Sequence, residues 1–263
     1  MKTFAPRVVH SAIAVLGLAL AAGSLPAEAR QALAGTGDAS AATNSPLVSE
    51  SAAHEIVSRV LAENKRRNER LRSYAVTRTY EIRTLEGKLG AQTVVRMEYR
   101  APDVKTFEKT SEKGSGIVRR LVFDRLMDSE SESSTGKQHR DSALTPANYE
   151  FHFVGEEEVG PHHCFLLDVV PRRKDKYLFE GRIWIDSQDF AVVKIAGHPA
   201  KKPSFWINQA DFVREYQKVA EFWLPLRDET QVDVKIYGKR VLTIDHGPYV
   251  LPSEPQRAAD PAN

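Results

Sequence analysis

The spacing of apolar and polar residues changes once along the chain. Between Ser51 and Leu71, apolar residues return every three or four positions with charged residues between them, which predicts one amphipathic helix of about twenty residues. Ser49 or Ser51 is the expected N-cap, because a hydroxyl there accepts a free backbone N–H. After Arg72 the period becomes two, and short alternating segments separated by turns predict an antiparallel meander.

The alternating segments supply about ten strands, separated by polar turns. They cover residues 74–83, 95–100, 104–110, 117–123, 149–154, 163–171, 180–186, 190–196, 211–216, 222–237 and 241–244. The run 128–145 holds almost no apolar residue and is expected to be a mobile loop. Gly114-Ser115-Gly116 lacks the context of a phosphate-binding loop and is interpreted as a hairpin turn.

Each predicted strand has one apolar face, so the strands are expected to bury a single side of a sheet. Sheets of this width usually curl or close. The sequence therefore predicts a mainly β (α+β) fold over residues 49–251. Its form is a single curved antiparallel sheet, or open half-barrel, of about ten strands. The N-terminal amphipathic helix is expected to pack on the concave face through Ile56 and Val60.

The two ends of the chain have compositions unlike the rest. Residues 1–29 combine an early basic stretch, an apolar core and small residues before Arg30, which is the pattern of a secretory signal cut after Ala29. The apolar core is about 11 residues long, whereas a spanning helix needs roughly 20. Residues 30–48 are expected to form a flexible leader and 252–263 a disordered tail. We therefore expect the mature chain in the bacterial periplasm, without a transmembrane span.

Charge and cysteine content exclude several classes of protein. Lys and Arg number 37 and Asp and Glu 35, so the chain has no basic excess and nucleic acid is not an expected partner. The single cysteine, Cys164, excludes an internal disulfide and a multi-cysteine zinc site. His162-His163-Cys164 is the densest group of metal-capable residues, but adjacent strand residues point to opposite faces. We expect no metal, no cofactor and a buried Cys164.

The remaining polar candidates favour structure over chemistry. Asp186 and Asp189 flank a predicted turn, where Asp usually hydrogen-bonds the local backbone. His246 precedes Gly247-Pro248 and is expected to face solvent at a turn. No serine lies in a GxSxG or SxxK context. The chain is therefore not expected to be an enzyme.

Two short segments carry a resemblance to a known family. Trp184-Ile185-Asp186 ends one predicted strand and Phe190 begins the next, with Lys194 four positions later; Phe222–Pro225 precedes a long strand. These segments resemble the LolA-like outer-membrane lipoprotein-sorting family, including relatives similar to the N-terminal domain of RseB. The resemblance implies an incomplete β-barrel with helices at its mouth and acyl chains against an apolar concave face.

The expected function is that of an exported lipid- or lipoprotein-binding carrier or sensor, which shelters acyl chains in an apolar concave cavity. The expected lining residues are Tyr80, Met97, Tyr99, Phe151, Phe153, Phe165 and Leu167. The expected contacts with a partner or with a membrane surface are Arg66, Arg67, Arg70, Phe205 and Trp206. One alternative is an envelope protein-interaction or stress-sensing module whose core is filled by its own side chains. The other is a secreted hydrolase with a dispersed active site.

Overall fold

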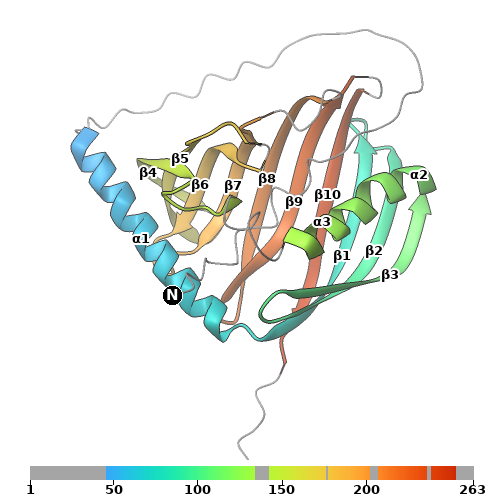
Figure 1. Cartoon of the computed structure of the whole chain (residues 1–263), viewed down its shortest axis with the longest axis horizontal. Helices are drawn as coiled ribbons and strands as arrows, with labels where there is room; N and C mark the ends of the chain where they lie inside the picture. The colour runs from blue at the N-terminus through green and yellow to red at the C-terminus, as the bar shows by residue number, and fades with distance from the viewer. Residues whose placement is uncertain (1–45, 134–141, 176, 202–206, 236–237, 253–263) are drawn as a thin grey trace, which may run out of the picture.

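The computed structural model describes residues 46–133, 142–175, 177–201, 207–235 and 238–252. The predicted signal peptide, most of the leader and most of the tail therefore lie outside the described residues, as do Phe205 and Trp206. The described chain forms one antiparallel sheet of ten strands whose two edge strands do not pair with each other (Figure 1). The expectation of a single open sheet of about ten strands is confirmed.

Neighbouring strands along the sheet follow the order β3-β2-β1-β10-β9-β8-β7-β6-β5-β4. The first and last strands of the chain, β1 and β10, therefore pair inside the sheet, two strands in from the β3 edge. The strands are β1 Ser73–Thr84, β2 Leu89–Arg100, β3 Val104–Gly114, β4 Tyr149–Val159, β5 His162–Pro171, β6 Phe179–Asp186, β7 Val192–Pro199, β8 Ile207–Val219, β9 Phe222–Val234 and β10 Gly238–Val250.

The helix α1 (Pro46–Arg70) precedes the sheet and ends where the sequence predicted. It begins before Ser49 and Ser51, so neither residue is the N-cap; Ser49 instead donates its hydroxyl to the carbonyl oxygen of Phe153 at 2.7 Å. Ile56 and Val60 are buried in the cluster that α1 forms with the β4–β7 end of the sheet. The predicted packing of the helix on the concave face is therefore confirmed.

A second helical segment corrects the expectation for residues 117–123. In place of a strand, α2 (Gly116–Val118), a π-helical stretch η3 (Arg119–Asp124) and α3 (Arg125–Ser133) follow β3 without a hairpin. The Ser115 side chain caps this segment by accepting the N–H of Val118 at 3.4 Å. The predicted hairpin turn is thus a strand-to-helix junction, and the predicted loop 128–145 begins inside a helix. A short apolar run fits both periods, which explains the error.

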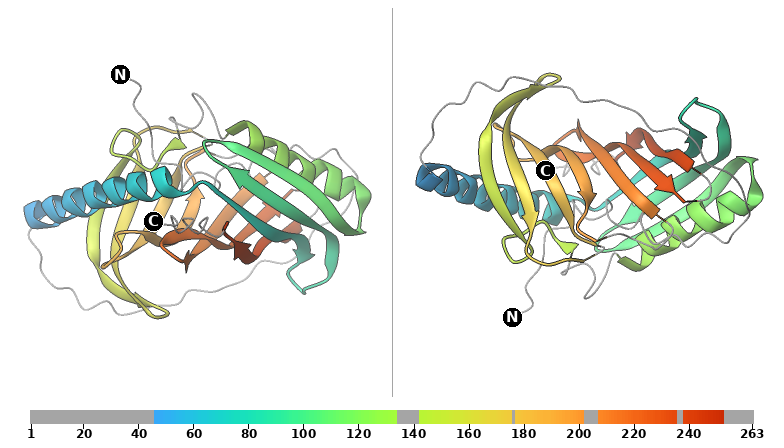
Figure 2. Two further views of the ribbon diagram at one scale, coloured as in Figure 1. Left: turned by 90° about the horizontal axis from the view of Figure 1, so that it is seen from below. Right: turned by 90° about the horizontal axis from the view of Figure 1, so that it is seen from above.

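The two helical segments cover opposite ends of the sheet (Figure 2). The cluster under α1 includes Leu167 and Ile183, while Phe123 of η3 packs on Tyr80 and Val95 at the other end. Strand registers place these sheet residues on one continuous face, which we call the concave face. The outward face carries charged cross-strand pairs, such as Arg227 with Asp245 at 2.6 Å.

Candidate functional site

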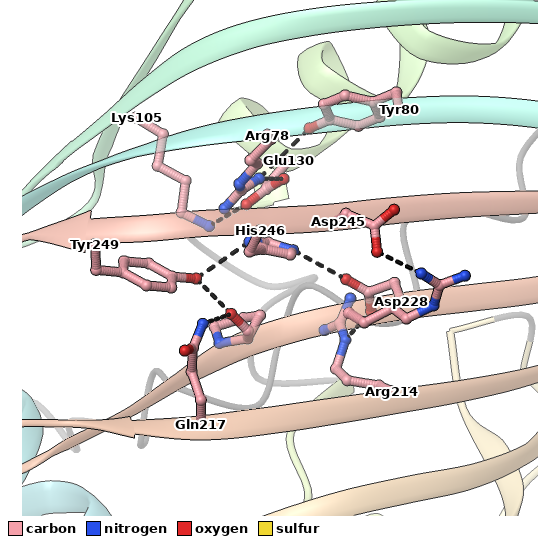
Figure 3. Close-up of polar contacts among 12 residues, drawn as sticks. Arg78, Tyr80, Lys105, Glu130, Arg214, Gln217, Asp228, Asp245, His246 and Tyr249 are labelled. Carbon is pink, nitrogen blue, oxygen red and sulfur yellow. Dashed lines mark hydrogen bonds and ion pairs between the residues drawn. The ribbon is translucent and has the colours of Figure 1, made fainter.

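The middle of the concave face, between the two helical covers, is lined by charged and polar side chains (Figure 3). We call this group the central polar cluster; its members are Arg78, Lys105, Glu130, Arg214, Tyr216, Asp228, His246 and Tyr249. The expectation of an apolar lining along the whole concave face is therefore wrong at its centre, although both flanks are apolar.

The strand registers explain why distant residues meet here. Arg78 on β1 lies opposite His246 on β10, and Arg214 on β8 lies opposite Asp228 on β9. The strands β8, β9, β10 and β1 are consecutive neighbours, so these four side chains cross the centre of the sheet. Glu130 reaches the same place from α3.

One half of the cluster is a carboxylate held between two cations. Glu130 accepts from Arg78 Nη1 at 2.8 Å and from Lys105 Nζ at 2.7 Å, and its side chain is only 11% exposed. Burial alone raises the pKa of Glu130, but Arg78 and Lys105 outweigh burial and hold that pKa well below its usual range. Burial likewise lowers the pKa of Arg78, and Glu130 outweighs it so that the net shift is upward. Glu130 is therefore ionised at neutral pH.

The other half is built around Asp228. This carboxylate accepts from Arg214 Nε and lies 3.2 Å from His246 Nε2. The Tyr249 hydroxyl lies 3.1 Å from His246 Nδ1 and donates to the Pro225 carbonyl at 2.7 Å. Burial, followed by the charge of Arg78, lowers the pKa of His246 despite the carboxylate beside it. Because both ring nitrogens are occupied and the ring is buried, His246 is placed to hold the cluster together rather than to move a proton on a substrate.

The cluster has an excess of hydrogen-bond donors. The cations Arg78 and Lys105 share the carboxylate of Glu130, and Arg214 pairs with Asp228. Arg78 Nε and Thr93 Oγ1 are buried without a hydrogen-bond partner among the described residues. Such groups are rare in folded proteins. They are suited to bind an anionic group with several acceptor oxygens.

The expected lining residues fall into separate regions. Phe151, Phe153, Phe165 and Leu167 lie together at the β4–β5 end of the sheet, where the rings of Phe153 and Phe165 are 6.4 Å apart. Tyr80 belongs to the cluster under η3 and α3. Met97 and Tyr99 belong to a third cluster around Tyr74. Only the first four residues could line one apolar surface.

His246 was expected at an exposed turn, which is wrong. It lies in β10 and is 7% exposed. The strand continues past Gly247 and Pro248 because these two residues form a bulge opposite Thr77, where a proline does not interrupt the ladder. The signal available in the sequence was the alternation Leu242, Ile244, His246, which continues the buried phase of the strand.

The basic end of α1 borders a surface hollow of about 220 Å³. Arg67 donates to the carbonyl oxygens of Asp189 and Phe190 at 2.9 and 3.1 Å, which fastens the helix to the β6–β7 turn. Arg70 pairs with Glu221 at 2.5 Å. Arg66 is largely exposed and pairs with Glu63 at 3.0 Å. The predicted role of these arginines as an outside contact stays a prediction.

The residues around Cys164 follow the predicted alternation. Cys164 is fully buried in β5, and burial raises the pKa of its thiol to about 12. His162 contacts Asp186 at 3.0 Å, whereas the exposed His163 lies between Glu156 and Glu158. Over the described ranges, no group of three or more His, Cys, Asp or Glu side chains is arranged to hold a metal ion. The turn predicted after Asp186 is confirmed, since its Oδ1 accepts two N–H groups of the turn backbone.

A family model described as "Family of unknown function (DUF5686)" matches residues 89–243, which is more than half of the chain. The chain belongs to the DUF5686 family. The matched part of this DUF5686 chain runs from β2 into β10, so it includes the strands that carry Arg214, Asp228 and Lys105. The helix α1 and the strand β1 precede it. No curated protein matches the chain.

Several solved structures are similar to this DUF5686 chain. One is a DUF1329 family protein from Desulfovibrio piger, with 12% identity, a TM-score of 0.41 and coverage of 76% of this chain and 92% of that chain. Another is a LolA superfamily protein from Nitrosomonas europaea, with 11% identity, a TM-score of 0.36 and coverage of 77% and 94%. A third is an outer membrane lipoprotein-sorting protein domain from Vibrio parahaemolyticus, with 11% identity, a TM-score of 0.40 and coverage of 78% and 95%. The likeness to LolA-superfamily proteins suggested by the sequence is confirmed, and it concerns the type of fold alone.

Proposed function

We propose that this DUF5686 chain is an exported, non-catalytic carrier or sensor that binds the acyl chains of a lipid or lipoprotein against its concave face. The observation that carries the proposal is the partial burial of the rings of Phe151, Phe153 and Phe165. These three rings are apolar, adjacent on β4 and β5, and only half-buried where α1 covers them. Grouped apolar rings that the folded chain covers only in part are a surface that an acyl chain can contact.

The cover over this surface is a separate element. The helix α1 contributes Ala53, Ile56, Val57 and Val60 to the cluster, and the short link before β1 is its covalent connection to the sheet. An acyl chain that replaced part of this packing would gain about 0.8 kcal/mol for each CH₂ removed from water.

The proposed location rests on residues 1–29, whose composition is that of a secretory signal. None of the helices in the described part of the chain has the length and apolar character needed to cross a membrane. The non-catalytic part of the proposal is tested with a panel of esterase, glycosidase and peptidase substrates, on which we expect no turnover.

The lipid is sought by mass spectrometry of an organic extract from protein purified out of the periplasm without detergent. We expect extractable lipid in near-stoichiometric amount from the native protein. Phe153→Glu should abolish it, because the charge would enter the apolar surface. Val154→Glu is the matched control, since Val154 is the next residue and is 45% exposed. Native protein that repeatedly yields no lipid would contradict the proposal.

A second candidate function is an envelope protein-interaction or stress-sensing module with a self-filled core. It is favoured by the complete burial of Met97 and Tyr80, which leaves no apolar surface accessible at those two positions. This candidate predicts lipid-free protein and a stoichiometric protein partner in a pull-down from the envelope fraction.

A further inference from the structure

The segment 116–133 packs on the concave face against apolar side chains of β1, β2 and β10. Its apolar side chains Val122, Phe123, Leu126 and Met127 are all buried there. The ring of Phe123 packs on Tyr80 with 5.8 Å between centroids. At 1.5 Å per residue, this apolar stripe is about 8 Å long.

One of the carboxylates that follow the apolar stripe, Glu130, turns towards the sheet. Glu130 lies one helical turn beyond Leu126 and Met127, and so on the same side of α3. It inserts between Arg78 and Lys105 at hydrogen-bonding distance from both, as Figure 3 shows. Towards the sheet, the segment thus presents an apolar length that ends in one buried negative charge.

We propose that the segment 116–133 is an internal substitute for an anionic amphiphile, and that the Arg78–Lys105 pair is the site for the ligand's carboxylate or phosphate head. This inference goes beyond the proposed function, because the segment lies at the opposite end of the sheet from Phe153 and marks a second site for an amphiphile. In the state described here Glu130 fills the head site and the apolar stripe fills the place of the chain. The ligand displaces the segment by making the same two kinds of contact.

Hydrogen-bonding atoms in and beside the head site are left without a bond when Glu130 is bound there. Arg78 Nε and Thr93 Oγ1 are buried without a partner among the described residues, and Thr93 lies opposite Tyr80 on the neighbouring strand. A phosphate or a free carboxylate has more freedom than a helix-bound side chain to reach these donors. The exchange of one anion for another avoids leaving Arg78 buried and unpaired, which would cost several kcal/mol.

The helical geometry agrees with a displaceable segment. The stretch Arg119–Asp124 is π-helical, an arrangement that is rare and frequent at functional sites. It interrupts the segment where Phe123 packs against Tyr80. Lys109 pairs with Asp124 at 2.7 Å on the partly exposed side, so the segment is also attached by a contact that solvent weakens.

The test compares three ligands that share a dodecyl-length chain: dodecanoate, dodecyl phosphate and the uncharged monolaurin. Binding to the full mature chain is measured by calorimetry below the critical micelle concentrations. Glu130→Gln should raise the affinity for both anionic ligands about tenfold, because the competing carboxylate is removed. The affinity for monolaurin should change far less. Asp128→Asn, which removes an exposed charge from the same helix, should leave all three affinities unchanged.

Lys105→Gln provides a second variant in case Glu130→Gln fails to fold. It keeps the Arg78–Glu130 pair and should lower the affinity for the anionic ligands about tenfold without affecting monolaurin. Amide hydrogen exchange of the unaltered protein gives an independent measurement of whether the segment moves. Dodecanoate should accelerate exchange of amides 116–133 relative to those of α1, since the ligand displaces that segment.

The outcomes separate this inference from the proposed function. Binding of all three ligands with equal affinity, unchanged by Glu130→Gln and Lys105→Gln, would overturn the inference and leave the lipid-binding function standing. Slower exchange of residues 116–133 with dodecanoate would overturn it as well. No binding of any ligand by any of the proteins would overturn both.

Discussion

Asp228 is the carboxylate on which Arg214 and His246 both depend, and its replacement by Asn tests the central polar cluster most sharply. The Arg214 side chain is 2% exposed and that of Asp228 is 10% exposed. Asp228→Asn would leave the guanidinium of Arg214 buried with no carboxylate beside it. Removing one member of a buried ion pair typically costs about 3–5 kcal/mol.

That loss is large relative to the whole stability of a domain, which is about 5–15 kcal/mol. For a domain of this size, about 3–5 kcal/mol corresponds to a decrease in Tm of roughly 6–20 °C. The assay is urea denaturation followed by tryptophan fluorescence, with Trp223 buried on β9 as a reporter. The urea concentration at the midpoint should fall, while the slope of the unfolding free energy against urea concentration stays the same.

Asp245→Asn is the matched control. Asp245 pairs with Arg227 at 2.6 Å on the outward face, where both side chains are more than 40% exposed. Its loss should cost less than about 1 kcal/mol. The double variant Arg214→Met with Asp228→Leu should recover most of the stability, because no buried charge is left unpaired. A loss in Asp228→Asn no larger than in Asp245→Asn would refute the electrostatic account of the cluster.

Three further predictions concern stability and the attachment of α1. Burial and the arginine beside it lower the pKa of His246 in the folded state, so the unfolded chain binds a proton near pH 6.5 that the folded chain does not. The free energy of unfolding should therefore be highest above that pH and fall as the pH drops below it. His246→Asn should make that fall smaller when urea titrations are repeated between pH 8 and pH 5. Leu167→Ala should cost about 2–5 kcal/mol because it opens a cavity in the fully buried cluster, whereas Leu226→Ala, at a position that is 40% exposed, should cost less than about 1 kcal/mol; equal losses would contradict the assigned core. Arg67→Ala should destabilise by about 1–2 kcal/mol and speed hydrogen exchange at the end of α1, while Arg66→Ala should do neither; if the two variants behave alike, the attachment is wrong.

The sheet was predictable from sequence because its alternation is local. The hairpin β6–β7 illustrates this, since the apolar phase of each strand and the Asp186 turn are read from a few adjacent residues. The segment 116–133 was not, because Ile117–Phe123 is a short apolar run that suits either period. The capping by Ser115 and the recurrence of apolar residues at 122, 123, 126 and 127 favour a helix, but only once the sheet surface that buries them is known.

The central polar cluster was missed for a different reason. Arg78, Arg214 and His246 each occupy a position in phase with the buried residues of their strand. Arg78, for example, follows Val76 and precedes Tyr80 at spacing two. A charged residue in the apolar phase is a signal that the sequence contains. Its meaning depends on β8, β9, β10 and β1 lying side by side, which local pattern does not provide.

The claim that the concave face receives an amphiphile is tested most directly by photocrosslinking in living cells. A benzophenone amino acid replaces Phe153 on the concave face in one protein and the exposed Gln231 on the outward face in another. After irradiation, intact-mass spectrometry should show lipid-sized additions to the Phe153 variant and none to the Gln231 variant. Additions at both positions alike, or at neither, would contradict the assignment of the concave face as the binding surface.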